Sequence, residues 1–434
     1  MDNQKGVMDR RIIVSDEIYK QELEQVFGRC WLWVGHESLL AKPNDFIAMY
    51  MGEDPVLVTR DSKGKLHTFL NMCRHRGNRI CRADAGNAPS FMCTYHGWTF
   101  ATDGKLVGVP GYKEAYFEEL DRSQWGLVEA RTDSYKGLIF ANWDNTAPSL
   151  LDYLGNITWH LDLCFDRSEG GSEILPGAHK WLMGMNWKFP TDNHMGDGYH
   201  VAITHGSILG AGAASGATAS GTMNPNMPRT LARQRFAFAF GNGHAVTGIT
   251  PWSGTWSADP TNPVSKFNEE HKEEFRRHLG EDKAKWQPGT FAIFPNLVIS
   301  NPAWSGSLKV FLPRGPLSTL GWSYYFVDKK APTEYRDTIR RYQTLMHGPS
   351  GIMESDDQLP FIQATGTARS LTGQRYMINQ QLGLGHEKMH EEIPAMCAPS
   401  PSEIGQRGFY GFWAEMMDAP SWSQVKLTPR AKNV

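Results

Sequence analysis

Apolar residues recur at helical spacing near the start of the chain and give way to short alternating runs further on. Ser15 can cap the opening helix, and Gly28 can end it. Between about residues 31 and 144, apolar runs such as 66–70 and 137–143 are separated by Gly, Asp and Asn turns. The pattern therefore predicts one helix between Ser15 and Gly28, followed by a β-rich unit.

After Pro148 helical and strand periodicities are mixed, so we expect a unit boundary between residues 145 and 150. Residues 210–221, GAGAASGATASG, are small and can bury little surface. They predict a mobile loop, which is either a plain linker or a flexible cover over a nearby site. Residues 268–280 are rich in charge and end in glycine, which is typical of an exposed helix.

Composition indicates a globular enzyme and argues against several other classes. The chain has 434 residues, of which 40% are hydrophobic and 21% charged, and its net charge is -2. This balance favours neither nucleic acid nor an anionic membrane as a partner. The N-terminal residues lack the apolar core of a signal peptide, and no apolar run is long enough to span a membrane. We therefore expect a cytoplasmic protein.

Two short loops of the β-rich unit each offer one thiolate and one imidazole. Cys73 and His75 are followed, after 17 residues, by Cys93 and His96. A Rieske [2Fe-2S] centre needs this arrangement, because one iron binds two Cys and the other binds two His. A mononuclear zinc site, or two unrelated Cys/His pairs, is the alternative. The sequence favours the Rieske cluster.

A second group of chemically active residues lies between Asp192 and His205, where 14 residues hold three imidazoles and two carboxylates. Asp197 and His200 are three apart and share one face of a helix. His200 and His205 are roughly 140° apart on a regular helix, so the helix must bend, bulge or end between them if both bind one ion. The 2-His-1-carboxylate group of non-haem iron oxygenases needs a third ligand. Residues 354–357, Glu-Ser-Asp-Asp, are the candidate, although a solvated helix start is the alternative.

Taken in order, these motifs resemble the large (alpha) subunit of Rieske-type aromatic-ring-hydroxylating dioxygenases, and within them the naphthalene/biphenyl/toluene group. The order is Cys-x-His, Cys-x-x-His, Asn-x-x-Gly-Asp-x-x-His-x4-His and Glu-Ser-Asp-Asp, and the resemblance covers nearly the whole chain. It implies an α+β fold, with a Rieske β-domain inserted in a larger catalytic domain whose antiparallel sheet is covered by helices. The implied ranges are an N-terminal helix in 1–36 that packs on the catalytic domain, a Rieske domain in 37–147 and a catalytic domain in 148–434.

The resemblance also assigns roles to individual residues. Cys73 and Cys93 would bind one iron of the cluster, and His75 and His96 would bind the other. A catalytic mononuclear Fe(II) would be held by His200, His205 and Asp357, with Asp356 as a structural neighbour.

Two further residues would support the catalytic iron. Asp197 would hydrogen-bond His200 of its own subunit and a cluster histidine of a neighbouring subunit, the residue that is His96 here. Asn193 would lie close to the iron without being a firm ligand. A carboxylate in that place fixes the tautomer and orientation of both imidazoles.

The implied activity is the addition of both atoms of O2 to an aromatic ring, which gives a cis-dihydrodiol. Electrons would come from NADH through a separate reductase, often with a ferredoxin, because the chain has no GxGxxG motif after a strand. A small beta subunit and an α3β3 hexamer are also implied. A Rieske monooxygenase, a pure Rieske electron carrier and a zinc-stabilised interaction protein are the alternatives.

Two positions that are commonly Phe in the hydrocarbon-oxidising members are histidines here, His194 and His347, and both would border the substrate pocket. A buried imidazole without a partner costs about 1 to 3 kcal/mol, which a carboxylate or hydroxyl on the ring would offset. We therefore expect a substituted aromatic acid, such as an alkylbenzoate. If protein groups or water satisfy the histidines, a neutral hydrocarbon such as biphenyl, naphthalene or an alkylbenzene fits instead. An Arg or Lys would favour a carboxylate more strongly, and the sequence places none in the pocket.

Overall fold

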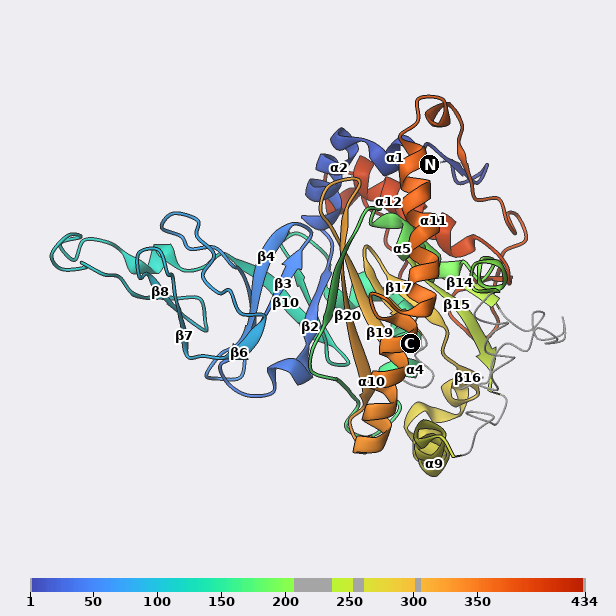
Figure 1. Cartoon of the computed structure of the whole chain (residues 1–434), viewed down its shortest axis with the longest axis horizontal. Helices are drawn as coiled ribbons and strands as arrows, with labels where there is room; N and C mark the ends of the chain where they lie inside the picture. Colours follow the sequence, from blue (N-terminus) through green and yellow to red (C-terminus); the bar gives the residue numbers. More distant parts are fainter. Residues whose placement is uncertain (1, 207–235, 253–260, 301–305, 432–434) are drawn as a thin grey trace. The chain divides into compact units, whose positions relative to one another are not determined.

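The computed structural model describes residues 2–206, 236–252, 261–300 and 306–431. The chain forms two compact units, one of residues Leu23–Leu150 and the other of Met1–Glu22 with Leu151–Val434 (Figure 1). The predicted mobile loop at 210–221 lies outside the described residues.

The first unit is almost entirely β-structure. Its strands are β2 (Leu32–His36), β3 (Asp45–Met51), β4 (Asp54–Arg60), β5 (Leu66–Leu70), β6 (Ala85–Asn87), β7 (Ser90–Met92), β8 (Thr99–Ala101), β9 (Leu106–Gly108), β10 (Glu129–Tyr135) and β11 (Leu138–Asn142). One antiparallel sheet has the order β2-β11-β10-β5-β4-β3-β6, and a smaller one has the order β7-β8-β9. Short helical turns lie at η1 (Leu23–Phe27), η2 (Glu37–Leu40) and η3 (Arg122–Trp125). The β-rich pattern of the sequence therefore gives two small sheets.

The second unit is built on a long antiparallel sheet. Its strands are β12 (Ser172–Ile174), β13 (His179–Met183), β14 (Phe236–Gly241), β15 (His244–Pro251), β16 (Trp286–Gln287), β17 (Thr290–Ile293), β18 (Leu297–Ser300), β19 (Ser307–Pro313), β20 (Thr319–Asp328), β22 (Lys388–Met389) and β23 (Met396–Pro399). The order is β12-β20-β19-β18-β17-β15-β14-β23-β22, with β13 paired to β20 and β16 to β15. A separate pair joins β1 (Val7–Met8) to β21 (Ile378–Asn379).

Helices complete this second unit. They are α1 (Arg11–Val14), α2 (Asp16–Glu22), α4 (Thr158–Phe165), α5 (Lys188–Gly196), α6 (Val201–Thr204), α9 (Pro263–Ala284), α10 (Thr333–His347), α11 (Ile352–Ala368) and α12 (Ile404–Asp418), with α3 (Leu150–Leu154) at the boundary and short turns η4 (Gly155–Ile157), η5 (Gly373–Arg375) and η6 (Trp422–Gln424). Helix α5 packs on strands β15 and β17, α12 packs on β14 and β15, and α10 packs on β20. The predicted α+β class with helices on an antiparallel sheet is confirmed.

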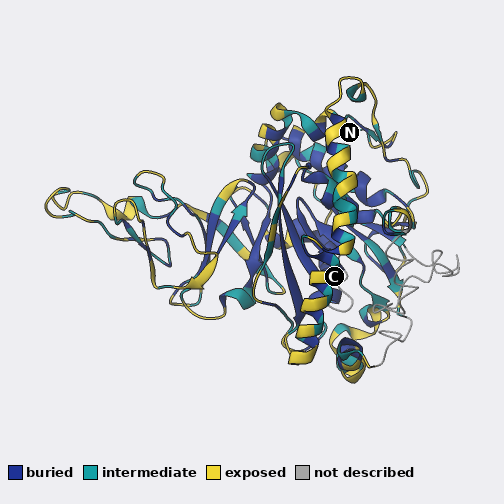
Figure 2. Ribbon diagram, viewed as in Figure 1, coloured by how far each residue is buried: buried dark blue, intermediate teal, exposed yellow. Residues whose placement is uncertain are grey.

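Burial follows the apolar pattern of the elements. Every residue of β19 is buried, whereas α10 buries a single stripe at every fourth position, formed by Tyr335, Ile339, Gln343 and His347. Figure 2 shows the sheet strands of this unit as mostly buried and the outer faces of its helices as exposed. The stripe places His347, the last residue of α10, at the core side of the helix.

Two predicted helices show how the local sequence acts. The opening helix runs through α2 and then widens into a π-helical turn at η1, where the Gly28 N–H bonds the carbonyl of Leu23. The predicted charged helix at 268–280 lies within α9 and breaks at Gly280, whose φ is 74°. Among the described residues, no helix is both long and apolar enough to cross a membrane.

Candidate metal centres

The two Cys/His loops of the first unit share one backbone design. The Cys73 carbonyl accepts a hydrogen bond from the Gly77 N–H, and the Cys93 carbonyl accepts one from the Gly97 N–H, both at 2.9 Å. Gly77 has a φ of 76° and Gly97 a φ of 75°. That left-handed conformation strains any residue with a Cβ, so glycine is required at both turns.

Both thiols are held in an apolar environment. Cys73 is 2% exposed and Cys93 is 1% exposed, and both pack with Trp98 in one hydrophobic cluster. Burial raises the pKa of Cys73. Cys93 is buried too, but the Asn78 amide, which donates to its Sγ at 3.5 Å, helps to hold its pKa below the usual value. The two thiols are therefore shielded from water and differ in acidity.

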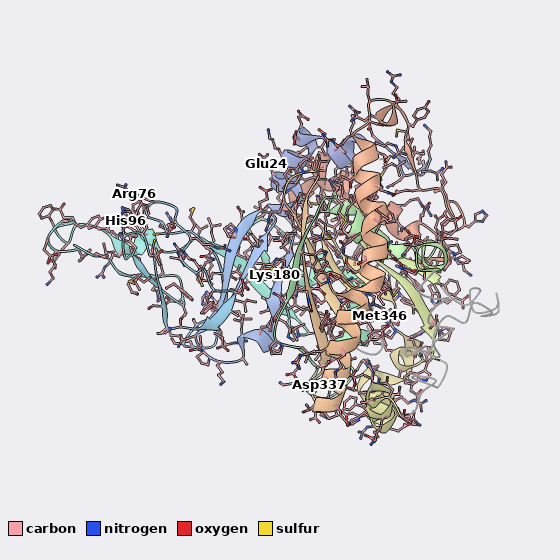
Figure 3. All side chains as sticks on the ribbon, viewed as in Figure 1. Glu24, Arg76, His96, Lys180, Asp337 and Met346 are labelled. Atoms are coloured by element: carbon pink, nitrogen blue, oxygen red, sulfur yellow. The ribbon has the colours of Figure 1, made fainter. Side chains whose placement is uncertain are left out.

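The imidazoles of these loops lie next to each other. The ring centroids of His75 and His96 are 4.6 Å apart, and His75 stacks on Trp98 at 5.0 Å. The Nδ1 atom of His75 is buried without a hydrogen-bond partner, and burial lowers the pKa of this ring. His96 is exposed, and Figure 3 shows it beside Arg76 of the other loop. Two buried thiols and two adjacent imidazoles, one with an orphaned nitrogen, fit the ligand set of a Rieske cluster.

The second unit brings together His200, His205 and Asp357, whose potential ligand atoms all lie within 4.8 Å of one another. The Oδ1 atom of Asp357 is 3.3 Å from Nε2 of His200 and 3.2 Å from Nε2 of His205. Nevertheless, this buried oxygen has no hydrogen bond of acceptable geometry. Three atoms that are close together but poorly aligned for hydrogen bonding aim at a common point, which suits a metal ion.

Helix α6 brings His200 and His205 close to each other. It spans four residues, with His200 immediately before it and His205 immediately after it. His205 already leaves helical geometry, at φ -98° and ψ 17°. A single helical turn between the two histidines therefore lets both imidazoles reach one point.

Asp197 holds the turn that precedes α6. Its Oδ1 accepts hydrogen bonds from the backbone N–H groups of Tyr199 (3.1 Å) and His200 (3.0 Å), and its Oδ2 is 3.3 Å from Nδ1 of His200. The amide nitrogen of Asn193 lies 3.2 Å from the same Nδ1. Because Asp197 occupies the Nδ1 side of the His200 ring, Nε2 is directed toward Asp357.

The charges around this group attract a cation. Burial alone lowers the pKa of His200, but Asp197 and Asp357 outweigh it and raise the pKa to about 10. In the same way, His200 and His205 outweigh burial and lower the pKa of Asp357. Asp356 does not join the three ligand atoms and instead lies 3.4 Å from Nδ1 of His205.

The two histidines expected at the pocket have different partners. Nδ1 of His194 donates to the carbonyl of Pro190 at 2.7 Å, so its Nε2 is left as an acceptor. Burial, reinforced by the charge of Lys309, lowers the pKa of His194 to about 3. Burial and Lys309 also lower the pKa of His347, which is 7% exposed. Both rings are therefore neutral. The Pro190 carbonyl already satisfies one nitrogen of His194, which agrees with the alternative expectation that protein groups satisfy these histidines.

Sequence reasoning missed a buried ion pair beside this group, between Lys309 of β19 and Glu354 of α11. The available signal was a lysine within the apolar run 307–313 of a buried strand. Asp192, which belongs to the dense motif, takes no part in the ligand group, because its carboxylate accepts from the Tyr410 hydroxyl at 3.0 Å.

Cys/His loops in one unit and a 2-His-1-carboxylate group in the other define the class of Rieske oxygenases. The family model described as "Rieske [2Fe-2S] domain" matches residues 30–125. The model described as "Ring hydroxylating alpha subunit (catalytic domain)" matches residues 151–419. The chain therefore belongs to the ring-hydroxylating dioxygenase alpha subunits, as its sequence predicts. The predicted cofactors, a Rieske [2Fe-2S] cluster and a mononuclear iron, are confirmed with the family.

Named relatives cover almost the whole chain. The biphenyl 2,3-dioxygenase alpha subunit of Rhodococcus jostii is 36% identical over 99% of this chain and 92% of its own length. A benzene 1,2-dioxygenase alpha subunit of Pseudomonas putida is 34% identical, over 98% and 94%. The crystal structure of naphthalene 1,2-dioxygenase from a Rhodococcus species, bound to indole, matches with a TM-score of 0.86 at 32% identity, over 96% of this chain and 98% of that one.

Proposed function

We propose that the chain is the terminal oxygenase component of a cis-dihydroxylating system, which adds both atoms of O2 to an aromatic ring. Electrons would come from NADH through a reductase, with or without a ferredoxin. The observation that carries the proposal is the convergence of His200, His205 and the orphaned Oδ1 of Asp357, in a chain that also holds two Cys/His loops. A pure electron carrier would have no use for that group.

The proposed ligands follow from these contacts. Cys73 and Cys93 would hold one iron of the cluster, His75 and His96 the other, and His200, His205 and Asp357 the mononuclear iron. When bound, that iron would supply the chemistry that activates O2. Asp197 would orient the imidazole of His200, and the amide group of Asn193 would lie against Nδ1 of the same ring.

We further propose that Asp197 links the iron site to the cluster of an adjacent subunit in an α3β3 assembly with a small beta subunit. The side chain of Asp197 is 33% exposed although it already contacts His200, so one side of the carboxylate remains open to a second imidazole. His96 is exposed as well, as a cluster ligand at such an interface must be. We also propose that this assembly works in the cytoplasm.

For the substrate we propose an aromatic ring with an acidic substituent, such as an alkylbenzoate. The support is the expected place of two imidazoles, those of His194 and His347, at the substrate pocket; the acceptor Nε2 of His194 fits a hydroxyl or a protonated carboxyl group on the ring. A neutral hydrocarbon is the second candidate. It is favoured by the names of the relatives, which are biphenyl and benzene dioxygenases, by the bond from His194 to Pro190 and by the pairing of Lys309 with Glu354.

Product analysis separates the two candidates. The iron-loaded, reduced protein is given O2 and either an alkylbenzoate or biphenyl, and the dihydrodiols are quantified. A dihydrodiol from the acid only supports the acidic substrate, and His194→Phe should then lower turnover of the acid relative to biphenyl. A dihydrodiol from biphenyl only rejects the acidic substrate and keeps the proposed reaction. No dihydrodiol from any aromatic compound, with both metal centres loaded, rejects the reaction itself.

A further inference from the structure

A fully buried ion pair joins strand β19 to helix α11. Lys309 is 0% exposed and Glu354 is 5% exposed, and the Lys309 ammonium donates to Oε2 of Glu354. Apart from Ser307 and Lys309, every residue of β19 is apolar, so the lysine is the one charged residue of a buried strand. A buried charge is tolerated only with a partner, because the loss of either one leaves an uncompensated charge in the core.

The pair lies one helical turn before the proposed carboxylate ligand. Glu354 and Asp357 are three residues apart on α11, so both project from the same side of the helix. The buried residues of α11 are Glu354, Thr365 and Ala368. The first half of the helix is therefore tied to the core through Glu354.

The far half of α11 has separate anchors. The hydroxyl of Thr365 accepts a hydrogen bond from the Asn186 N–H at 3.0 Å, and the ring of Phe361 stacks on Phe189 with centroids 6.3 Å apart. Asp357 thus lies between an ionic contact on one side and these contacts on the other. Glu354 is the one buried side chain in the first half of α11, a helix that also packs on α10, α1 and α5.

A buried ion pair adds little to stability, but it fixes the relative positions of its two side chains. Replacing such a pair by apolar residues of similar volume is often neutral or stabilising, since both charges must be desolvated. A charged hydrogen bond, by contrast, is directional, whereas apolar contacts allow a helix to slide or turn. The use of Lys309 and Glu354 at this point therefore indicates a requirement for position.

We propose that Lys309 and Glu354 are positioning residues, which fix the first turns of α11 so that Asp357 meets His200 and His205 at one point. The inference rests on the proposed function, because it takes these three side chains as the iron ligands. A pair that only stabilises the fold is the alternative.

The double variant Lys309→Met/Glu354→Leu distinguishes the two roles, because it removes both charges and keeps apolar volume. In the full-length protein, iron affinity is measured by competition with a chromophoric chelator, and stability by the thermal unfolding midpoint. We expect a midpoint close to that of the wild type, with iron bound about 10- to 100-fold more weakly, as when groups that orient metal ligands are removed. The visible spectrum of the Rieske cluster should be unchanged. Wild-type iron affinity in this variant would overturn the positioning role.

Two further variants keep the test decisive. Glu354→Asp retains the charge but shortens the reach by one methylene. A positioning role predicts weaker iron binding in this variant, whereas a purely stabilising role predicts wild-type iron binding. Asp357→Ala tests the underlying ligand set: if it keeps wild-type iron affinity, the proposed function fails at its ligands. If it loses iron while the double variant and Glu354→Asp keep it, only the positioning role fails. Lys283→Met/Asp162→Leu, which removes an ion pair between α9 and α4, is the matched control and should leave iron affinity unchanged.

Discussion

Replacing Asp197 by Asn tests the connection between the turn before α6 and catalysis. Asparagine has the same shape, and its carbonyl oxygen can still accept from the backbone N–H groups of Tyr199 and His200, which lie at 3.1 and 3.0 Å. What is lost is the charged acceptor beside Nδ1 of His200, because the amide NH2 group takes the place of Oδ2, which lies 3.3 Å from that nitrogen. The variant therefore separates the contact with His200 from the backbone bonds that hold the turn.

The size of the effect on iron binding follows from that contact. A hydrogen bond to a charged group contributes about 1.5 to 3 kcal/mol, against about 0.5 to 1.5 kcal/mol for a neutral one. Losing this charged bond therefore costs about 1.5 to 3 kcal/mol at His200, which corresponds to roughly 10- to 150-fold weaker iron binding. Within the subunit the cluster loops supply no atom of this contact, so the cluster content should not change.

Turnover should fall even where iron binding is restored by excess iron. If Asp197 also joins the iron site to the cluster of an adjacent subunit, we expect turnover to drop by more than about 100-fold even at saturating iron, because two charge-assisted contacts are weakened. Single-turnover and steady-state rates are measured with iron content determined in the same samples. Asp166→Asn is the matched control, since Asp166 also faces a histidine, His278 at 3.2 Å, away from the metal ligands. Normal turnover of the Asp197 variant at full iron loading would refute the bridging role.

Three further predictions concern stability and cluster assembly. Gly77→Ala should lower cluster content, since a φ of 76° costs a residue with a Cβ about 1 to 2 kcal/mol. Cluster content is measured as iron and acid-labile sulfide. Gly366→Ala is the control, because an added Cβ there meets nothing within 4 Å. Glu22→Gln should reduce the free energy of unfolding by about 3 to 5 kcal/mol in denaturant titrations, because it leaves the fully buried ammonium of Lys188 without its carboxylate; a loss below about 1 kcal/mol would contradict this. Asp61 is buried, but the contact with His67 and the hydrogen bonds from the backbone N–H groups of Lys65 and Lys63 together outweigh burial and lower its folded pKa. Its contribution is therefore complete above the unfolded pKa of about 3.9 and is lost as pH falls through the lower folded value; Asp61→Asn should flatten that acid limb, and an unchanged limb would contradict the pairing.

Short-range spacing was sufficient to find the candidate ligand residues that the structure brings together. Cys73 and His75 lie within one hydrogen-bonded turn, and so do Cys93 and His96. The two members of each pair are therefore close together because of the local sequence. The requirement that the helix be interrupted around His200 and His205 also came from their five-residue separation, and α6 meets it in a single turn.

Contacts between distant parts of the chain could not be predicted in the same way. Lys309 and Glu354 are 45 positions apart, and Glu22 and Lys188 are 166 apart, so no local periodicity links either pair. The proton position on His194 was equally hidden, because it depends on the backbone carbonyl of Pro190 in the folded helix. Such details decide how strongly a polar substrate is favoured.

The central claim is that this chain supports dioxygenation at an iron held by His200, His205 and Asp357. The most direct test supplies the reduced, iron-loaded protein with an aromatic substrate and ¹⁸O2, and determines the oxygen isotopes in the product by mass spectrometry. We predict a cis-dihydrodiol in which both hydroxyl oxygens are labelled, and no such product from the Asp357→Ala variant. A product that carries one labelled oxygen, or a labelled diol that forms equally well without Asp357, would contradict the account.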